Sequence, residues 1–221
     1  MNTVSKYSKF NKKHTAATKE YLKRQASDPY VKRARQAGYR SRAAFKLIEI
    51  DDKFNLLRPG QVVVDLGAAP GSWTEVVIQR QRGQGRVIAI DKLEMAEIPQ
   101  AIILQGDFLS NEVFDQLKTH CPPGDAGGVD VVLSDLAPET TGNLGLDHLR
   151  SMALVELAAE FARQTLKPGG AFVTKIFMGG EEKQFLASLR PHFTKVTFCK
   201  PQASRRDSKE IFIVATGFKN A

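Results

Sequence analysis

From about residue 60 onward, short apolar runs alternate with longer stretches in which apolar residues recur at helical spacing. The alternation predicts strands at 62–66, 87–91, 102–105, 129–134, 172–176, 195–199 and 211–216, and helices at 74–82, 112–119, 149–166 and 181–189. A helical pattern also begins at Pro29, and Ser41 is a plausible N-cap for a further helix through Ala44, Leu47 and Ile50. Strands alternating with helices predict an α/β fold with a mainly parallel seven-stranded sheet and helices on both faces.

The most informative stretch is residues 61–73, which read QVVVDLGAAPGSW. Its β-branched apolar run lacks polar alternation, as expected for a strand buried on both faces. The glycines that follow let the backbone turn tightly and approach a ligand closely. In an open α/β sheet, ligands bind at the carboxyl ends of the strands, where this turn is predicted.

Two features of the turn argue against a dinucleotide site. The fingerprint G-x-G-x-x-G is absent, and Pro70 removes an N–H group that a pyrophosphate would need. Asp91, about 20 residues after Gly71, is placed to accept hydrogen bonds from ribose hydroxyls. The pattern favours an adenosine ligand without a pyrophosphate, for which S-adenosylmethionine is the obvious candidate. A purely structural turn is the alternative, and a nicotinamide-dependent dehydrogenase is disfavoured.

The chain has 221 residues with 42% apolar residues, which suits one α/β domain with a modest extension. It has neither a long apolar stretch nor an apolar signal sequence, and a reducing cytoplasm is the expected compartment. Two cysteines and four scattered histidines predict neither a disulfide framework nor a metal site.

The positive charge is concentrated near the N-terminus. The first 46 residues contain 13 Lys and Arg against two acids, whereas the net charge of the whole chain is only +8. We interpret residues 1–27 as a basic, disordered arm and residues 28–221 as the catalytic domain. The arm favours a nucleic-acid partner over a solvated tail, because four rings interleave with the charges and can stack on bases: Tyr21, Tyr30, Tyr39 and Phe45.

Four charged residues lie where a buried sheet would not normally accommodate them. Lys46 is on an apolar-spaced helix, Asp135 ends the run VVLSD, Lys175 interrupts AFVTKIF, and Glu210 opens EIFIVAT. Taken singly, each of these four residues is better interpreted as an edge residue whose charge reaches solvent than as a catalytic residue. Together, two cations and two anions could neutralise one another in a single cleft.

The segments SRAAFKL, VDLGAAPGSW, GDF, VVLSDLAP, FVTKIF and SRRDSKEIFIVATG resemble the FtsJ/RrmJ (RlmE) family of ribosomal-RNA 2′-O-methyltransferases, from about Pro29 to the C-terminus. The resemblance implies a Rossmann-like S-adenosylmethionine-dependent methyltransferase fold. Ser72 departs from it, because the family usually has a second Gly there. The catalytic tetrad of the family falls on Lys46, Asp135, Lys175 and Glu210. Its cofactor contacts fall on Gly71, Trp73, Asp91, Asp107 and Asp135.

The resemblance implies methyl transfer to the ribose of a uridine in large-subunit ribosomal RNA. We expect the assembled large subunit to be the partner and the enzyme to be a monomer. Lys175 is the expected base. A lysine acts as a base only when neutral, which burial and Lys46 favour and which Asp135 and Glu210 oppose; otherwise Lys175 orients the hydroxyl and stabilises the alkoxide. Arg205, Arg206 and Lys209 are candidates for RNA phosphate binding. Two alternatives remain, a cap or transfer-RNA 2′-O-methyltransferase and a non-catalytic ribosome-assembly factor.

Overall fold

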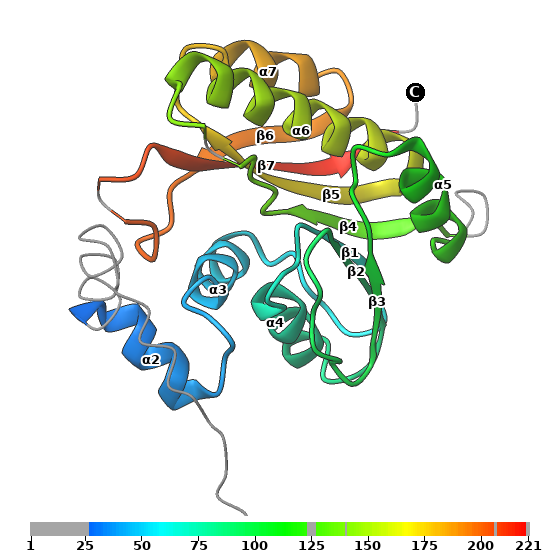
Figure 1. Cartoon of the computed structure of the whole chain (residues 1–221). Helices are drawn as coiled ribbons and strands as arrows, with labels where there is room; N and C mark the ends of the chain where they lie inside the picture. Colours follow the sequence, from blue (N-terminus) through cyan, green and yellow to red (C-terminus); the bar gives the residue numbers. More distant parts are fainter. Residues whose placement is uncertain (1–26, 123–126, 140, 206, 220–221) are drawn as a thin grey trace, which may run out of the picture.

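The computed structural model describes residues 27–122, 127–139, 141–205 and 207–219. Its centre is one seven-stranded sheet with the strand order β3-β2-β1-β4-β5-β7-β6 (Figure 1). Every neighbouring pair is parallel except β5 with β7 and β6 with β7. The strands are β1 (Val62–Leu66), β2 (Arg86–Asp91), β3 (Ala101–Gln105), β4 (Val129–Ser134), β5 (Leu166–Phe177), β6 (Phe193–Cys199) and β7 (Glu210–Phe218).

Helices cover both faces of the sheet, as the sequence pattern predicts (Figure 1). Apolar side chains of α5, α6 and α7 form the core on one face, and those of α3 and α4 form the core on the other. The described helices are α2 (Pro29–Ala37), α3 (Ala44–Phe54), α4 (Ser72–Arg80), α5 (Asn111–His120), α6 (Leu144–Thr165) and α7 (Glu182–Leu189). None of these helices is long and apolar enough to cross a membrane.

The predicted strands and helices are all present, and the differences lie at their ends. Helix α6 begins five residues before the predicted start, because the side chain of Asn143 accepts hydrogen bonds from the N–H groups of Gly145 and Leu146. The prediction that Ser41 caps α3 is wrong, since the helix follows Ala43 without a side-chain cap. Strand β5 begins six residues before the predicted start at 172, and its first part contains an irregularity in the pairing with β4.

The strand order changes direction at β1 (Figure 1). Strands β2 and β3 lie on one side of β1, and β4, β5, β7 and β6 lie on the other. The parallel strands β1, β2 and β4 end at Leu66, Asp91 and Ser134, so the loops that follow them emerge at the same edge. In open α/β sheets this edge beside the switch point forms the ligand crevice. The fold therefore places the Gly-rich turn, Asp91 and Asp135 together.

Asp65, in β1, is a carboxyl with no exposed surface. Its Oδ2 atom accepts a hydrogen bond of 2.7 Å from the Thr74 hydroxyl, which ties α4 to the sheet. Oδ1 has no hydrogen-bond partner among the described residues. Burial, with the nearby carboxylates of Asp135 and Asp91, raises the pKa of Asp65 from 3.8 to about 7, against the opposing effect of the Thr74 hydrogen bond.

This raised pKa predicts a pH dependence of stability. Between about pH 4 and pH 7 the Asp65 carboxyl ionises in the unfolded chain and stays protonated in the folded protein, so its contribution to stability falls as pH rises. Asp65→Asn removes this titration. The stability of the variant relative to the native protein should rise by up to about 1.4 kcal/mol per pH unit in that window. Urea unfolding of both proteins at several pH values measures the difference, and parallel stability curves would contradict the prediction.

Candidate active site

A cleft of about 640 Å³ lies at the carboxyl edge of the sheet. Its walls come from the loops after β1, β2, β3 and β4, together with one side of α6. The lining combines acidic side chains with apolar ones, as expected of a site for a polar organic ligand. The lining includes Gly67, Ala69, Asp91, Lys92, Leu93, Asp107, Leu109, Asp135 and Leu136.

The acids after β2 and β3 organise their own loops. Asp91 accepts hydrogen bonds of 2.9 Å from the N–H groups of Ala69 and Leu93, so it joins the Gly-rich turn to the loop after β2. Asp107 accepts one of 3.0 Å from the N–H of Leu109. The two leucines are left 60% and 57% exposed within the cleft lining. Because each carboxylate oxygen accepts more than one hydrogen bond, both acids keep acceptor capacity for a ligand.

Two glycines allow the turn after β1 to pack tightly. A Cβ at Gly67 would lie 2.9 Å from the backbone nitrogen of Leu136, and one at Gly71 would lie 2.5 Å from Cδ1 of Ile98. Both also have positive φ angles, of 76° and 106°. Gly71 immediately precedes α4, whose first-turn N–H groups have no acceptors within the helix.

Gly71 and Trp73, both expected at the cofactor, are not part of the cleft wall. The Trp73 side chain is buried, with its ring 5.7 Å from that of Phe212, and its indole N–H donates to the carbonyl of Ala43 at 2.9 Å. Asp91, Asp107 and Asp135 do line the cleft. Only the backbone N–H of Trp73, at the start of α4, is suited to reach a ligand.

Strand register brings the four predicted catalytic residues to one face of the sheet. In the antiparallel pair of β5 and β7, Lys175 is opposite Phe212 and Phe177 is opposite Glu210. Because side chains alternate along a strand, Lys175 and Glu210 are diagonal neighbours on the same face. That face carries α3, which supplies Lys46.

The four residues form two ion pairs. Nζ of Lys175 lies 2.8 Å from Oδ1 of Asp135 and donates a hydrogen bond of 2.7 Å to the backbone carbonyl of the same residue. Nζ of Lys46 lies 2.9 Å from both carboxylate oxygens of Glu210. All four side chains are at most 20% exposed, so each charge is compensated by its partner. Asp135 therefore belongs both to the ligand cleft and to this cluster.

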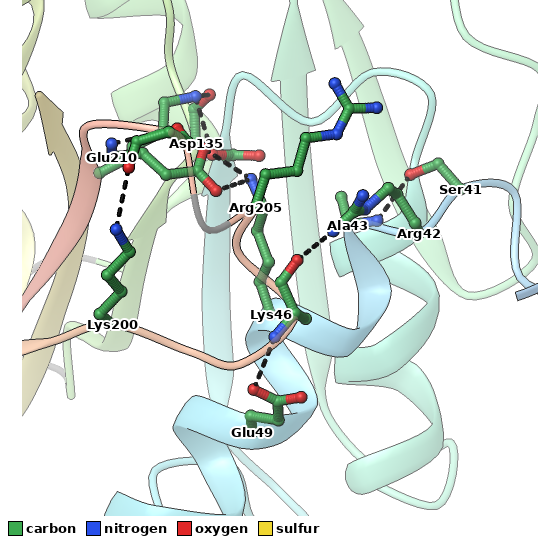
Figure 2. A network of polar contacts seen from close by, with 12 residues as sticks. Ser41, Arg42, Ala43, Lys46, Glu49, Asp135, Lys200, Arg205 and Glu210 are labelled. Carbon is green, nitrogen blue, oxygen red and sulfur yellow. Dashed lines mark hydrogen bonds and ion pairs between the residues drawn. The ribbon is translucent and has the colours of Figure 1, made fainter. Parts of the chain in front are cut away.

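A second cavity, of about 330 Å³, opens beside the Lys46–Glu210 pair. Arg42, Arg205 and Ser208 contribute to its wall. Figure 2 shows the polar network around it, in which α3 and the loop before β7 face one another. Arg42 holds that loop in place, because it is hydrogen-bonded to Asp28 and to the carbonyl of Ala203.

Comparison with known proteins assigns this arrangement to a family. The model of the FtsJ-like methyltransferases matches residues 39–218, which include all four charged residues of the cluster. The chain belongs to the FtsJ-like methyltransferase family.

Relatives with assigned names agree with the family. A ribosomal RNA large subunit methyltransferase E from Paramagnetospirillum magneticum is 50% identical over 206 residues, 91% of this chain and 83% of the relative. The protein of the same name from Parvibaculum lavamentivorans is 49% identical, over 94% of this chain and 84% of its own. A solved structure assigned as a ribosomal RNA methyltransferase from Plasmodium falciparum superposes with a TM-score of 0.72 at 32% identity, covering 81% of this chain and 98% of that one.

The rings of the N-terminal region serve this FtsJ-like domain as a packing cluster. Tyr30 and Tyr39 lie 5.5 and 5.9 Å from Phe45, centroid to centroid, and Arg33 covers the Phe45 ring at 4.4 Å. These contacts fasten α2 to α3, so the three rings are engaged within the protein rather than displayed for stacking. Tyr21, Arg206 and the predicted arm lie outside the described residues, apart from Ser27.

Two features of the methyltransferase site were not predicted. Ser72, the departure from the family pattern, is buried and its hydroxyl lies 2.8 Å from that of Ser41. Arg40 donates hydrogen bonds to both loops beside the cleft. In the sequence Arg40 is one cation among many in a basic stretch, and no pattern distinguished it from the solvated ones.

The Lys46–Glu210 pair yields a test of its energetic role. Glu210→Leu should lower the free energy of unfolding by about 3 kcal/mol, because it leaves the Lys46 ammonium buried without its counter-charge. Adding Lys46→Met should restore most of that loss, since two apolar side chains then replace the pair. Denaturant unfolding of the three proteins tests this, and a double variant no more stable than Glu210→Leu would contradict it.

Proposed function

We propose that the protein is an S-adenosylmethionine-dependent methyltransferase that modifies the ribose 2′-oxygen of a uridine in large-subunit ribosomal RNA. The observation that carries the proposal is the position of Asp135, which lines the ligand cleft and contacts Lys175 in the charged cluster. A methyl donor in the cleft and an acceptor hydroxyl beside Lys175 would thus meet at one residue. The names of the relatives supply the substrate class, ribosomal RNA of the large subunit.

The residues of the cleft fit the cofactor. We assign Asp91 to its ribose hydroxyls and Asp107 to its adenine amino group, because both are acceptors with capacity to spare at the cleft wall. Gly71 and Trp73 are assigned to it through their backbone, at the N-terminus of α4. Bound there, S-adenosylmethionine supplies an electrophilic methyl group on a sulfonium, which becomes a thioether when the methyl is displaced.

Lys175 and Asp135 are proposed to act on the hydroxyl as a unit. Lys175 aligns the 2′-oxygen for in-line attack and accepts its proton while passing one of its own to Asp135. The oxygen thereby gains a methyl and loses a proton, and the ion pair gains one positive charge in total. This arrangement gives Lys175 both roles that the sequence left open. Lys46 is proposed to steady the same 2′-oxygen or an adjacent phosphate, and Glu210 to position the lysines.

The acceptor strand is assigned to the second cavity. It adjoins Lys46 and Glu210, and Arg42 and Arg205 give it a positive wall. Lys209 and Arg206 continue the basic stretch along the chain before β7. The basic arm, residues 1–27, is proposed to extend RNA binding beyond the catalytic domain, 28–221. We further propose a monomeric, cytoplasmic enzyme that acts on the assembled large subunit.

Methyl transfer from labelled S-adenosylmethionine to ribosomal particles from cells lacking the protein tests the function. Lys175→Ala should abolish labelling of ribose 2′-oxygens while cofactor binding persists, because Lys175 acts on the hydroxyl rather than on the cofactor. Lys195→Ala is the matched control, since Lys195 is an exposed lysine of β6 that pairs with Thr216, six residues along β7 from Glu210.

Three outcomes would count against the proposal. Retained turnover in Lys175→Ala would remove that lysine from the reaction. Label on transfer RNA or a messenger cap, instead of ribosomal RNA, would identify a different 2′-O-methyltransferase. A complete absence of label with any RNA, together with rescue of the deletion strain by Lys175→Ala, would indicate a non-catalytic assembly factor.

Arg205→Ala tests the RNA path. Arg205 is 37% exposed and its Nε lies 3.9 Å from Oδ2 of Asp28, so its guanidinium is available at the edge of the cavity. Its removal should weaken RNA binding and lower the slope of log affinity against log salt concentration by about one. Arg190→Ala, at the exposed end of α7 on the other face of the sheet, should leave the slope unchanged. Equal slopes for Arg205→Ala and the native protein would exclude a phosphate contact.

A further inference from the structure

Arg40 makes an unusually large set of contacts for a residue in the short connection between α2 and α3. Its guanidinium donates hydrogen bonds of 3.0 Å to the carbonyl of Pro70, 2.9 Å to that of Ala96 and 2.8 Å to that of Glu97. Nε contacts Oε1 of Glu75 at 3.0 Å, and the backbone N–H of Arg40 donates to Oε2 of the same carboxylate at 3.1 Å. Every nitrogen of the side chain is therefore used in a contact within the protein.

The partners of Arg40 belong to the two loops that frame the cofactor cleft. Pro70 is in the Gly-rich turn after β1, and Glu75 is in the first turn of α4. Ala96 and Glu97 belong to the loop after β2, which begins with the cleft residues Lys92 and Leu93. These loops are far apart in sequence, and a single planar guanidinium joins them from outside the cleft.

Packing around Gly71 shows how closely the loops meet. A Cβ at Gly71 would lie 3.2 Å from Nη1 of Arg40. It would also lie 2.5 Å from Cδ1 of Ile98, near the end of the loop after β2. The positive φ of Gly71, 106°, favours glycine at this position, and the ends of the Ile98 and Arg40 side chains fill the space that a Cβ would need. No contact of Gly71 with a ligand is needed to account for the glycine.

We infer that Arg40 is a positioning residue that sets the geometry of the cofactor cleft by holding the Gly-rich turn against the loop after β2. The inference rests on the proposed function, since the cleft is the proposed site of S-adenosylmethionine. Asp91 makes the corresponding link on the inner side, through its hydrogen bonds to Ala69 and Leu93. Arg40 and Asp91 thus link the same two loops, Arg40 from outside the cleft and Asp91 from within its lining.

Arg40 also connects these two loops to the acceptor side of the site. The next residue, Ser41, has its hydroxyl 2.8 Å from that of Ser72 at the start of α4, and Arg42 and Lys46 follow at the second cavity. The same short segment therefore contacts the loops beside the cofactor cleft and lines the second cavity. Lysine cannot replace Arg40, because one ammonium group cannot reach three carbonyls and a carboxylate in the plane of a guanidinium fork.

The experiment measures binding of S-adenosylhomocysteine, the demethylated cofactor, by calorimetry without RNA. Arg40→Ala should weaken binding by about tenfold or more, because loosening the two loops costs at least the equivalent of one charge-assisted hydrogen bond. In methyl transfer it should raise KM for S-adenosylmethionine while kcat stays within about twofold, since Arg40 touches none of the four residues of the charged cluster. Arg40→Lys should resemble Arg40→Ala.

Arg80→Ala is the matched control. Arg80 also joins α4 to α3, through ion pairs of 3.3 Å with Asp51 and 2.6 Å with Asp52, but it contacts neither loop of the cleft. It should lower stability without changing cofactor affinity. Unchanged binding in Arg40→Ala, an equal loss of binding in Arg80→Ala, or full recovery in Arg40→Lys would each overturn the inference.

Hydrogen exchange separates this inference from the proposed function. The amides of Ala68, Ala69 and Gly71 and those of residues 92–98 should exchange faster in Arg40→Ala and not in Arg80→Ala. If the native protein binds no S-adenosylhomocysteine, the proposed function fails, and exchange alone decides whether Arg40 holds the two loops. Unchanged exchange at both loops would overturn the positioning role regardless of the ligand.

Discussion

Burial of four charges at one edge of the sheet is the constraint on which the site depends. A lysine with 7% of its side chain exposed is stable only with an anion beside it, and Asp135 provides both a carboxylate and a carbonyl for Lys175. Asp135 can do so because it follows β4, next to β5 in the sheet. Charge compensation therefore ties the position of the four charged residues to the strand order. The ligand cleft, which shares Asp135, is tied to the same order.

The Gly-rich turn shows a comparable dependence on its surroundings. Asp91, at the end of β2, accepts a hydrogen bond from Ala69 in this turn. Arg40, in the connection between α2 and α3, donates one to the carbonyl of Pro70. The glycines remove the side chains that would prevent these approaches. The loops after β1 and β2, which line the cleft, are thus held in position by hydrogen bonds to a few charged side chains. In this chain, Arg40, which does not line the cleft, therefore joins loops that do.

The N-terminal helices connect stability to function in the same way. The rings of α2 and α3 pack together, and Arg42 anchors the loop before β7 through Asp28 and Ala203. That loop leads directly into Glu210, which neutralises Lys46 on α3. Both walls of the proposed RNA cavity are therefore fixed by contacts among segments about 160 residues apart in sequence. Three rings that looked suited to stacking on bases, those of Tyr30, Tyr39 and Phe45, pack against one another within the protein instead.

The sequence by itself determined the sheet, the helices on both faces and the identity of the four charged residues, because apolar periodicity and motif spacing are local properties of the chain. It also located Asp91 and Asp135 at the cleft, since the ends of parallel strands meet at one edge, whereas Asp107 was placed there through the family resemblance. Only the tertiary structure decided which lysine pairs with which acid, that the Trp73 side chain is core, and that Arg40 joins two loops. Those outcomes depend on strand register and on contacts between segments distant in sequence, which no local pattern encodes.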